Sequence, residues 1–599
     1  MKILRMAVWL LVLLSALAQA GNYGQARLAE EREDWNEAIR LYRLAVQEEP
    51  GNLSAWLRMA DVYAAIDAWS EAGEAMREAG THHPDQARVF FDGARAFAEA
   101  GEPEVGLEMA RRAVELEPDN PDYLEAQGNL AGWLGQGDLA IESFERALEL
   151  GPQRTWVLLS LGLQTAWAGE LDRGAALLRQ YLETHPEHID ALLHLVDFEI
   201  WRGSYATALR MLEDYRELAG EDRAYLGKRA RILAWLGRRD AAVEILDALL
   251  AEEPDNPDLH YSRALALRET QPEQALESVA MVEQALPGAR ETIDLARSTR
   301  LPLRSRLFLE LDAFRDSDSI RTRSATVGGS HHFTPSTHLD ASVQRRRWEA
   351  DLGSGLEPED GTTSVENTRY RLGLGHRLNP DWTIDLHLGQ NDIERVDNTW
   401  FYGIGARWRA SDTLNLGLGH DKDLFAISPR TVFNRLERRA TTATLELRPQ
   451  IAHSLNLTVS YQDISDGNSR RALSSAYRYD WIRSQSWNVD LTASGGWVSF
   501  DDSPNTGYYA PSRYRFAGVG FLAYWKISDD DGIGLNYGIG LQKDETFDDA
   551  KVFHDVSIDA VFGIFRDWML LLSVGYSDRQ NQAGGFDARV GSVRLERRF

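Results

Sequence analysis

The hydrophobic pattern of the chain changes near residue 303, from a pattern typical of helices to one typical of strands. Before this point apolar residues recur with the 3.6-residue period of amphipathic helices. After it they alternate with polar residues, as where Leu414, Leu416 and Leu418 alternate with Asn415 and Gly417. About sixteen such segments of roughly ten residues follow one another. The pattern predicts helices over residues 21–290, a linker at 291–303 and a sheet over 304–599.

The helical part carries an internal repeat of 34 residues. Small residues keep this period at positions where two helices must cross closely, such as Ala38, Ala72 and Gly106. Proline keeps it too and marks helix ends, because proline cannot continue a helix: Pro50, Pro84, Pro118, Pro152, Pro186 and Pro254. A period of 34 is the signature of tetratricopeptide repeats, so we expect seven to eight helix-turn-helix repeats. Such arrays mostly bind other molecules, which leaves the function open.

Four tryptophans share this period, each near the end of the first helix of its repeat. They are Trp133, Trp167, Trp201 and Trp235. By resemblance to tetratricopeptide arrays, this position faces the concave groove. Flat indole faces suit the C–H faces of sugar rings, and the indole N–H adds a donor. One hypothesis is therefore a glycan-binding ladder, and the alternative is that these residues pack between repeats as core. Trp35 and Trp69 occupy a position that predicts a packing role.

The alternating segments match the strands of a transmembrane β-barrel, which are apolar toward lipid and polar toward the lumen. A soluble sandwich would show the same alternation. Two further features favour the barrel: tight turns such as "LNPDW" alternate with long loops such as "DLGSGLEPEDGTTS", and tryptophans gather near strand ends. We therefore expect a helical tetratricopeptide solenoid followed by a 16-stranded antiparallel transmembrane barrel.

The last strand ends on Phe599. A terminal aromatic residue is typical of the signal by which outer-membrane proteins are recognised for barrel insertion. An even strand number puts both ends of the barrel on the side of the short turns. We therefore expect the barrel in the outer membrane of a Gram-negative cell and the helical array in the periplasm.

The alternation also predicts which charged residues face the lumen, although one bulge in a strand would reverse the assignment. About sixteen strands leave an aqueous lumen. The candidates are polar residues of both signs on the face opposite the leucines: Arg371, Asp385, Arg407, Asp421, Glu446, Asp480, Asp490, Asp555 and Asp559. They predict a polar lumen of mixed sign, and a merely solvated face is the alternative.

The first twenty residues are typical of a secretory signal peptide, with Lys2 and Arg5 before an apolar run and a small-residue site ending at Ala20. The net charge of −27 argues against nucleic-acid binding. This acidity is concentrated before residue 303 and indicates either a solvated surface or a preference for cationic partners. The chain has no cysteine, which excludes disulfides and thiolate sites.

The order of signal peptide, 34-residue repeats and barrel resembles the exopolysaccharide export porins, most closely those of poly-β-1,6-N-acetylglucosamine, and also those of cellulose and Pel. The late loop "GYYAPSRY" is similar to an aromatic-x-Pro-x-Arg stretch of these barrels, which here comprises Tyr508, Tyr509, Pro511 and Arg513. The repeat array is shorter than is usual for these exporters. The resemblance implies export of a polymer, with the array guiding it or docking a periplasmic deacetylase or another protein of the synthase complex. Partial deacetylation makes such a polymer a cationic amino-sugar chain.

No catalytic motif, metal site or cofactor site is predicted, and we expect no enzyme activity. The histidine group His331, His332 and His338 flanks a turn and is read as solvated rather than metal-binding. Two other functions stay open: a surface receptor or adhesin with a plugged pore, and a scaffold for envelope assembly anchored by the barrel.

Overall fold

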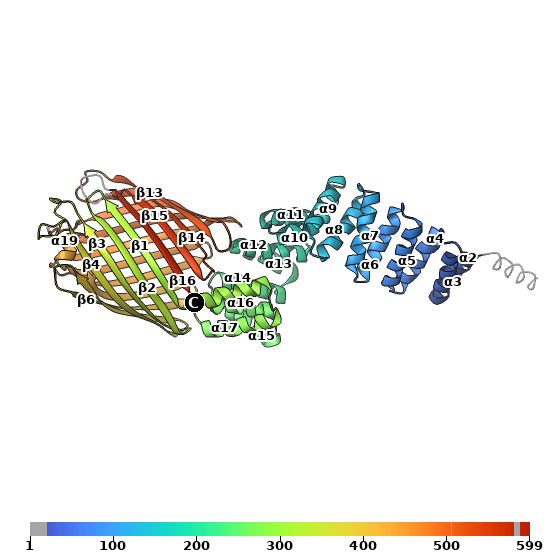
Figure 1. Ribbon diagram of the computed structural model, residues 1–599, viewed down its shortest axis with the longest axis horizontal. Coiled ribbons are helices and arrows are strands. Elements are labelled where there is room, and N and C mark those ends of the chain that lie inside the picture. Colours follow the sequence, from blue (N-terminus) through green and yellow to red (C-terminus); the bar gives the residue numbers. More distant parts are fainter. Residues whose placement is uncertain (1–20, 505, 580–586) are drawn as a thin grey trace, which may run out of the picture. The chain divides into compact units, whose positions relative to one another are not determined.

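The computed structural model describes residues 21–504, 506–579 and 587–599. The predicted signal peptide therefore lies outside the described residues. The chain divides into two compact units, one ending at Phe198 and the other spanning Glu199–Phe599. Helices precede residue 304 and strands follow it, as the change of hydrophobic period predicts (Figure 1).

The helical part is built of antiparallel helix pairs, from α2/α3 to α16/α17. The helices are α2 (Asn22–Glu30), α3 (Trp35–Glu48), α4 (Leu53–Ala65), α5 (Trp69–His82), α6 (Ala87–Glu99), α7 (Pro103–Leu116), α8 (Pro121–Trp133), α9 (Gly137–Leu150), α10 (Val157–Trp167), α11 (Leu171–Thr184), α12 (Ile189–Trp201), α13 (Tyr205–Ala219), α14 (Arg223–Trp235), α15 (Arg239–Glu252), α16 (Pro257–Leu267), α17 (Pro272–Ala285) and α18 (Arg290–Arg300).

In the first seven pairs, the turn within the pair contains one residue in the left-handed backbone region. Glycine fills this position from the third pair to the seventh, as at Gly101 (φ 75°) and Gly237 (φ 69°). The helices of a pair then cross closely, as where an added Cβ on Gly174 would lie 2.7 Å from the carbonyl oxygen of Gly162. Small residues at the predicted crossing positions are therefore required by the packing.

The segment predicted as a linker, 291–303, is not a linker. It forms α18 and a short 3₁₀ turn at Leu301–Leu303. Leu295 and Ala296 are buried in the core cluster that α14 to α17 share, because α18 presents an apolar stripe to α16 and α17. The helical part therefore continues to the first strand.

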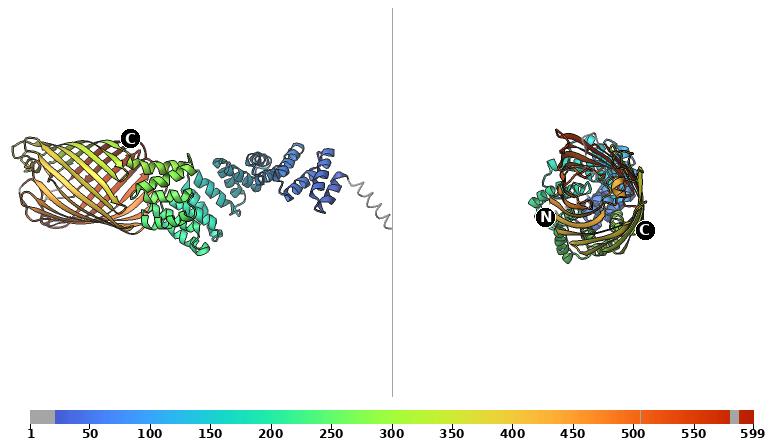
Figure 2. Two further views of the ribbon diagram at one scale, coloured as in Figure 1. Left: turned by 90° about the horizontal axis from the view of Figure 1, so that it is seen from below. Right: turned by 90° about the vertical axis from the view of Figure 1, so that its left-hand side faces the viewer.

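Sixteen antiparallel strands form one closed barrel in which β1 pairs with both β2 and β16 (Figure 2). The strands are β1 (Arg306–Asp316), β2 (Arg321–Thr334), β3 (Thr337–Glu349), β4 (Ser364–Asn379), β5 (Trp382–Ile393), β6 (Thr399–Ser411), β7 (Leu414–Leu424), β8 (Glu437–Gln450), β9 (His453–Ile464), β10 (Ser469–Arg483), β11 (Trp487–Phe500), β12 (Tyr514–Lys526), β13 (Gly532–Lys543), β14 (Lys551–Phe562), β15 (Trp568–Ser577) and β16 (Ala588–Arg598). The register from Arg306↔Arg598 to Asp316↔Ala588 closes the wall, so the sheet has no open edge.

The two ends of the barrel differ in their connections. At one end, here called the short-turn end, turns such as 335–336, 380–381 and 412–413 join the strands. The other end, the long-loop end, carries segments such as 350–363, 425–436 and 501–513, and the second of these contains the short helix α19 (Pro429–Phe433). Phe599 lies at the short-turn end, where its N–H donates to the carbonyl of Ser305 at 2.9 Å.

The outer face of the barrel is apolar and carries aromatic pairs near the short-turn end. Trp382 stacks on Trp408 with ring centroids 5.6 Å apart, and Trp487 stacks on Trp525 at 6.1 Å. Trp348 also lies near a strand end, but it is buried with Val365 at the long-loop end, because its register places it on the inner face.

Candidate functional site

The inner face of the barrel is identified by an ion pair between strands that are not neighbours. Arg369 of β4 lies 2.8 Å from Asp423 of β7, although β5 and β6 separate these strands in the sheet. Two side chains can meet in this way only across the concave side of a closed wall. The face that carries Arg369 and Asp423 is therefore the lumen face.

The strand register places all nine candidate lumen residues on this face. Residues paired across neighbouring strands share a face of the sheet. The pairs that carry the assignment from strand to strand include Arg371↔Gly389, Thr383↔Arg407, Gly403↔Asp421 and Gly538↔Asp555. A bulge in β10 after Asp480 leaves that residue paired with Asp490, so both stay on the lumen face. Asp385, Glu446 and Asp559 follow by the same alternation.

Most charges on the lumen face are already paired. Arg371 pairs with Asp340, and Asp421 lies 3.0 Å from Arg438. Arg483 lies 2.6 Å from both Asp480 and Asp490.

Two further candidate acids on the lumen face also have partners. Asp555 pairs with Arg579, and Glu446 lies 2.6 Å from Arg448. Such neutralised pairs give a polar surface with little net field, on which a solute meets many weak contacts rather than one strong site.

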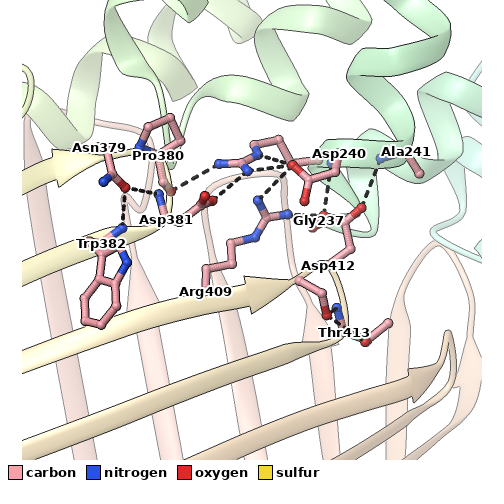
Figure 3. Close-up of polar contacts among 12 residues, drawn as sticks. Gly237, Asp240, Ala241, Asn379, Pro380, Asp381, Trp382, Arg409, Asp412 and Thr413 are labelled. Atoms are coloured by element: carbon pink, nitrogen blue, oxygen red, sulfur yellow. Dashed lines mark hydrogen bonds and ion pairs between the residues drawn. The ribbon is translucent and has the colours of Figure 1, made fainter.

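At the short-turn end, the turn between α14 and α15 is bonded to the barrel (Figure 3). Arg238 donates to the carbonyl oxygens of Asp412 at 2.7 Å and Arg448 at 2.5 Å. Arg239 donates to the carbonyl of Pro380 at 3.1 Å and pairs with Asp381 at 2.7 Å. The two arginines therefore reach the turns after β4 and β6 and the last residues of β8.

Asp412 of the barrel also caps helix α15. Its carboxylate accepts the backbone N–H groups of Asp240 at 3.0 Å and Ala241 at 3.1 Å. The first N–H groups of a helix have no partner within the helix and carry partial positive charge, so a carboxylate stabilises them. Arg409 pairs with Asp412 in turn and donates to the carbonyl of Gly237 at 3.4 Å (Figure 3).

A cavity of about 1270 Å³ lies between these last repeats and the short-turn end of the barrel. Trp235, Tyr261 and Arg268 line it from the helices, and Tyr524 and Lys526 line it from β12. His332 and His338 also line this cavity, with ring centroids 5.1 Å apart. The cavity therefore joins the helical surface to the mouth of the barrel.

The four periodic tryptophans are each the last residue of a helix and are exposed. The exposed fraction is 67% for Trp133, 58% for Trp167, 52% for Trp201 and 36% for Trp235. Trp235 is the least exposed of them, because Tyr205 stacks beside it at 6.4 Å and the guanidinium of Arg268 lies 5.5 Å from its ring. Exposed indoles are available to a ligand, as the glycan hypothesis requires.

At the long-loop end, the loops pack on one another rather than extending outward. Their shared apolar cluster comprises Phe425, Leu436, Ile464, Phe500, Tyr508 and Ala510. Ser428, which caps α19, donates its hydroxyl to the carbonyl of Gly507 at 2.5 Å. The late-loop motif lies here: Tyr508 and Pro511 are buried, Tyr509 is half-buried, and Arg513 is exposed.

Models of the tetratricopeptide repeat match residues 28–90, 168–232 and 203–267, and a second such model matches residues 91–155. The helical part is an array of tetratricopeptide repeats. A comparison with curated protein sequences finds no match.

Several solved structures are similar to parts of the chain. A bacterial polysaccharide outer membrane secretin has 12% identity and a TM-score of 0.43, covering 50% of this chain and 99% of that one. YrrB, described as a TPR protein with an unusual peptide-binding site, has 19% identity and a TM-score of 0.29, with coverages of 31% and 97%. PilF of Pseudomonas aeruginosa has 19% identity and a TM-score of 0.29, with coverages of 35% and 96%.

Sequence reasoning missed both the arginine contacts and the loop cluster. The one available signal for the contacts is the pair Arg238-Arg239 directly after the Gly237 turn, which the other repeats lack. Within residues 21–504, 506–579 and 587–599, no group of three or more His, Cys, Asp or Glu side chains could hold a metal ion. No helix in these same ranges is long and apolar enough to cross a membrane.

Proposed function

We propose that the chain exports an exopolysaccharide through the barrel, across the outer membrane. The observation that carries this proposal is the pairing of a polar, largely ion-paired lumen with a repeat array bonded to the short-turn end of the barrel. The apolar outer face and stacked tryptophans suit a lipid bilayer. A polymer bound by the repeats would pass from the cavity at Trp235 directly into the lumen.

The polymer is proposed to be a partially deacetylated poly-N-acetylglucosamine of a biofilm matrix. A net charge of −27 attracts a cationic chain, and exposed indoles offer surfaces for its sugar rings. The array, in the periplasm, guides this polymer or docks the deacetylase or another protein of the synthase complex. Phe599 is the residue proposed for recognition by the barrel assembly machinery.

Transport of this kind requires that no single site hold the polymer tightly. The lumen meets this requirement because its carboxylates are mostly shared with arginines, as in Arg369–Asp423 and Arg438–Asp421. A glucosaminium unit would then meet partly neutralised acids and move on, and hydroxyl groups would exchange water for serine, threonine and asparagine side chains along β8 and β9.

The test is deletion of the gene from its host, followed by an assay of β-linked amino-sugar polymer in the periplasm and in the medium. We expect polymer to accumulate in the periplasm and to disappear from the medium, and the full chain supplied on a plasmid should restore secretion. Normal polymer in the medium of the deletion strain would refute export.

A second candidate, a surface receptor with a closed pore, is favoured by the packing of the loops around Tyr508 and Phe425 at the long-loop end. Conductance of the purified chain in planar bilayers separates the two functions. An exporter should show open-pore conductance that a soluble oligomer of the polymer reduces, and a plugged receptor should show none.

A further inference from the structure

A second cavity, of about 600 Å³, lies beneath the packed loops at the long-loop end of the lumen. Phe425, Tyr509 and Pro511 line it from the loops, and Gln462 and Arg470 line it from β9 and β10. Its volume falls within the range of small-ligand sites, about 300–1,000 Å³. Aromatic walls with a few convergent polar groups are typical of such sites.

Arg470 is the unusual group in this cavity. Its register partners are Gln462 and Phe500, so it is on the lumen face, and its guanidinium lies 6.0 Å from the ring of Phe500. Among the described residues, no hydrogen-bond acceptor or carboxylate partners Arg470. A half-buried guanidinium without an acceptor is costly, since its five N–H donors have lost part of their water.

The other two arginines of the cavity differ from Arg470 because both are neutralised. Arg438 lies 3.0 Å from Asp421, and Arg579 pairs with Asp555. The cavity therefore presents one free guanidinium whose local field favours an oxygen acceptor and disfavours an ammonium group.

The walls are held in place before any ligand arrives. The Tyr508 hydroxyl donates to Asp466 at 2.9 Å, and the Tyr509 hydroxyl donates to Asp544. The carboxylate of Glu545 accepts the backbone N–H groups of Ser512 at 2.6 Å and Arg513 at 3.0 Å. Such preorganisation reduces the entropy cost of binding.

We propose that this cavity binds one N-acetylated sugar unit of the polymer and excludes a unit with a free amine. Arg470 and Gln462 would donate to the acetamido carbonyl and ring hydroxyls, and the aromatic walls would cover the apolar face of the ring. This inference rests on the proposed function and adds to it. An acidic array that favours deacetylated units and a loop site that favours acetylated units together suit a polymer that carries both.

The test uses the full chain in detergent micelles and isothermal titration with β-1,6-linked glucosamine trimers. The wild-type chain should bind the fully acetylated trimer at least tenfold more tightly than the fully deacetylated one at this site. Arg470→Gln should weaken binding of the acetylated trimer about tenfold, because hydrogen bonds to a charged donor are among the stronger ones. Gln462→Leu should weaken it severalfold.

Arg346→Gln is the matched control. Arg346 is also half-buried on the lumen face, its guanidinium lies 5.4 Å from the ring of Trp348, and it has no acceptor among the described residues, but it lies outside this cavity. Its loss removes the same charge from the lumen and should leave trimer affinity unchanged. Equal losses from Arg346→Gln and Arg470→Gln, or a preference for the deacetylated trimer that Arg470→Gln leaves unchanged, would overturn the proposal.

The gene-deletion experiment keeps this inference separate from export itself. If deletion traps polymer in the periplasm while Arg470→Gln and Gln462→Leu leave trimer affinity unchanged, export holds and the binding site is refuted. If deletion leaves secretion normal, export is refuted whatever the trimer affinity.

Discussion

The two ends of the barrel are stabilised by different kinds of contact. At the short-turn end, arginine side chains of a repeat donate to backbone carbonyls and carboxylates of the barrel turns. At the long-loop end, loops of the barrel pack on each other through an apolar cluster and a few carboxylates that accept backbone N–H groups. The first set of contacts fixes one part of the chain against another, and the second can loosen without moving either part.

The contact between Arg238 and the short-turn end of the barrel depends closely on the positions of the carbonyl groups that Arg238 bonds. It is buried, and burial lowers its pKa, with Asp412 opposing this shift. Its hydrogen bonds go to two backbone carbonyl oxygens, which accept best near the plane of the carbonyl group. A buried charge satisfied by fixed carbonyls tolerates little displacement, so the last repeats and the barrel should move as one body.

The largest effect is expected from Arg238→Ala combined with Arg239→Ala. This change removes the charge-assisted hydrogen bonds to two turns and to the end of β8, and it should lower the free energy of opening of α14 and α15 by about 3 kcal/mol. Hydrogen exchange of the α14 and α15 amides in the full chain measures this opening.

Arg290→Ala supplies the control for that change. Arg290 also joins the helices to the barrel, through Asp529 at 2.6 Å, but the two side chains are 83% and 80% exposed. Exposed ion pairs contribute about 0–1 kcal/mol, so exchange should barely change. Similar exchange in both variants would contradict the view that Arg238 and Arg239 hold α14 and α15 against the barrel.

The sequence predicted the elements of both ends but not these contacts. The 34-residue period and the strand alternation follow from local chemistry, because helices and strands each bury one face. Periodicity assigns a residue such as Arg238 to a turn, yet it cannot name a partner like Arg448, which is far along the chain. The same limit explains the linker prediction: the polar composition of α18 hid the Leu295 and Ala296 that pack on its neighbours.

The candidate site also has a part that the sequence predicts and a part that it does not. Alternation placed Asp421 and Arg407 on one face, since each strand repeats every two residues. The cavity around Arg470 could not be predicted, because its walls come from loops whose conformations depend on packing between segments such as 425–436 and 501–513. The motif residues Tyr509 and Pro511 were found by resemblance, and only the structure shows that they line a cavity.

A smaller effect, confined to the long-loop end, is expected from Gly507→Ala. Gly507 has a φ of 94°, and an added Cβ would lie 2.8 Å from the side chain of Arg430. Left-handed backbone costs about 1–2 kcal/mol for a residue with a Cβ, so the loop at 501–513 should open more often. Trypsin cleavage after the exposed Arg513 should accelerate about tenfold.

Gly361→Ala is matched to this variant in backbone geometry. Its φ is 81°, but an added Cβ would meet no atom within 4 Å, and the residue lies in the separate loop 350–363. Cleavage after Arg513 should stay close to the wild-type rate. If both variants accelerate cleavage equally, the contact with Arg430 does not hold the loop.

The smallest effect is a pH dependence of the same loop through Glu545. Burial alone would raise the pKa of Glu545, but the backbone N–H groups of Ser512 and Arg513 outweigh it and lower the pKa below the usual value. An unfolded-state glutamate has a pKa of about 4.3, so the stabilisation is complete above that pH and is lost as pH falls through the lowered folded-state pKa.

Hydrogen-exchange protection of Ser512 and Arg513 should fall a few-fold between about pH 6 and pH 3, a small change because solvent screens this exposed carboxylate. Glu545→Gln removes the titrating group and should therefore flatten the dependence. If Glu545→Gln kept the wild-type pH dependence, a group other than Glu545 would set the protection of Ser512 and Arg513.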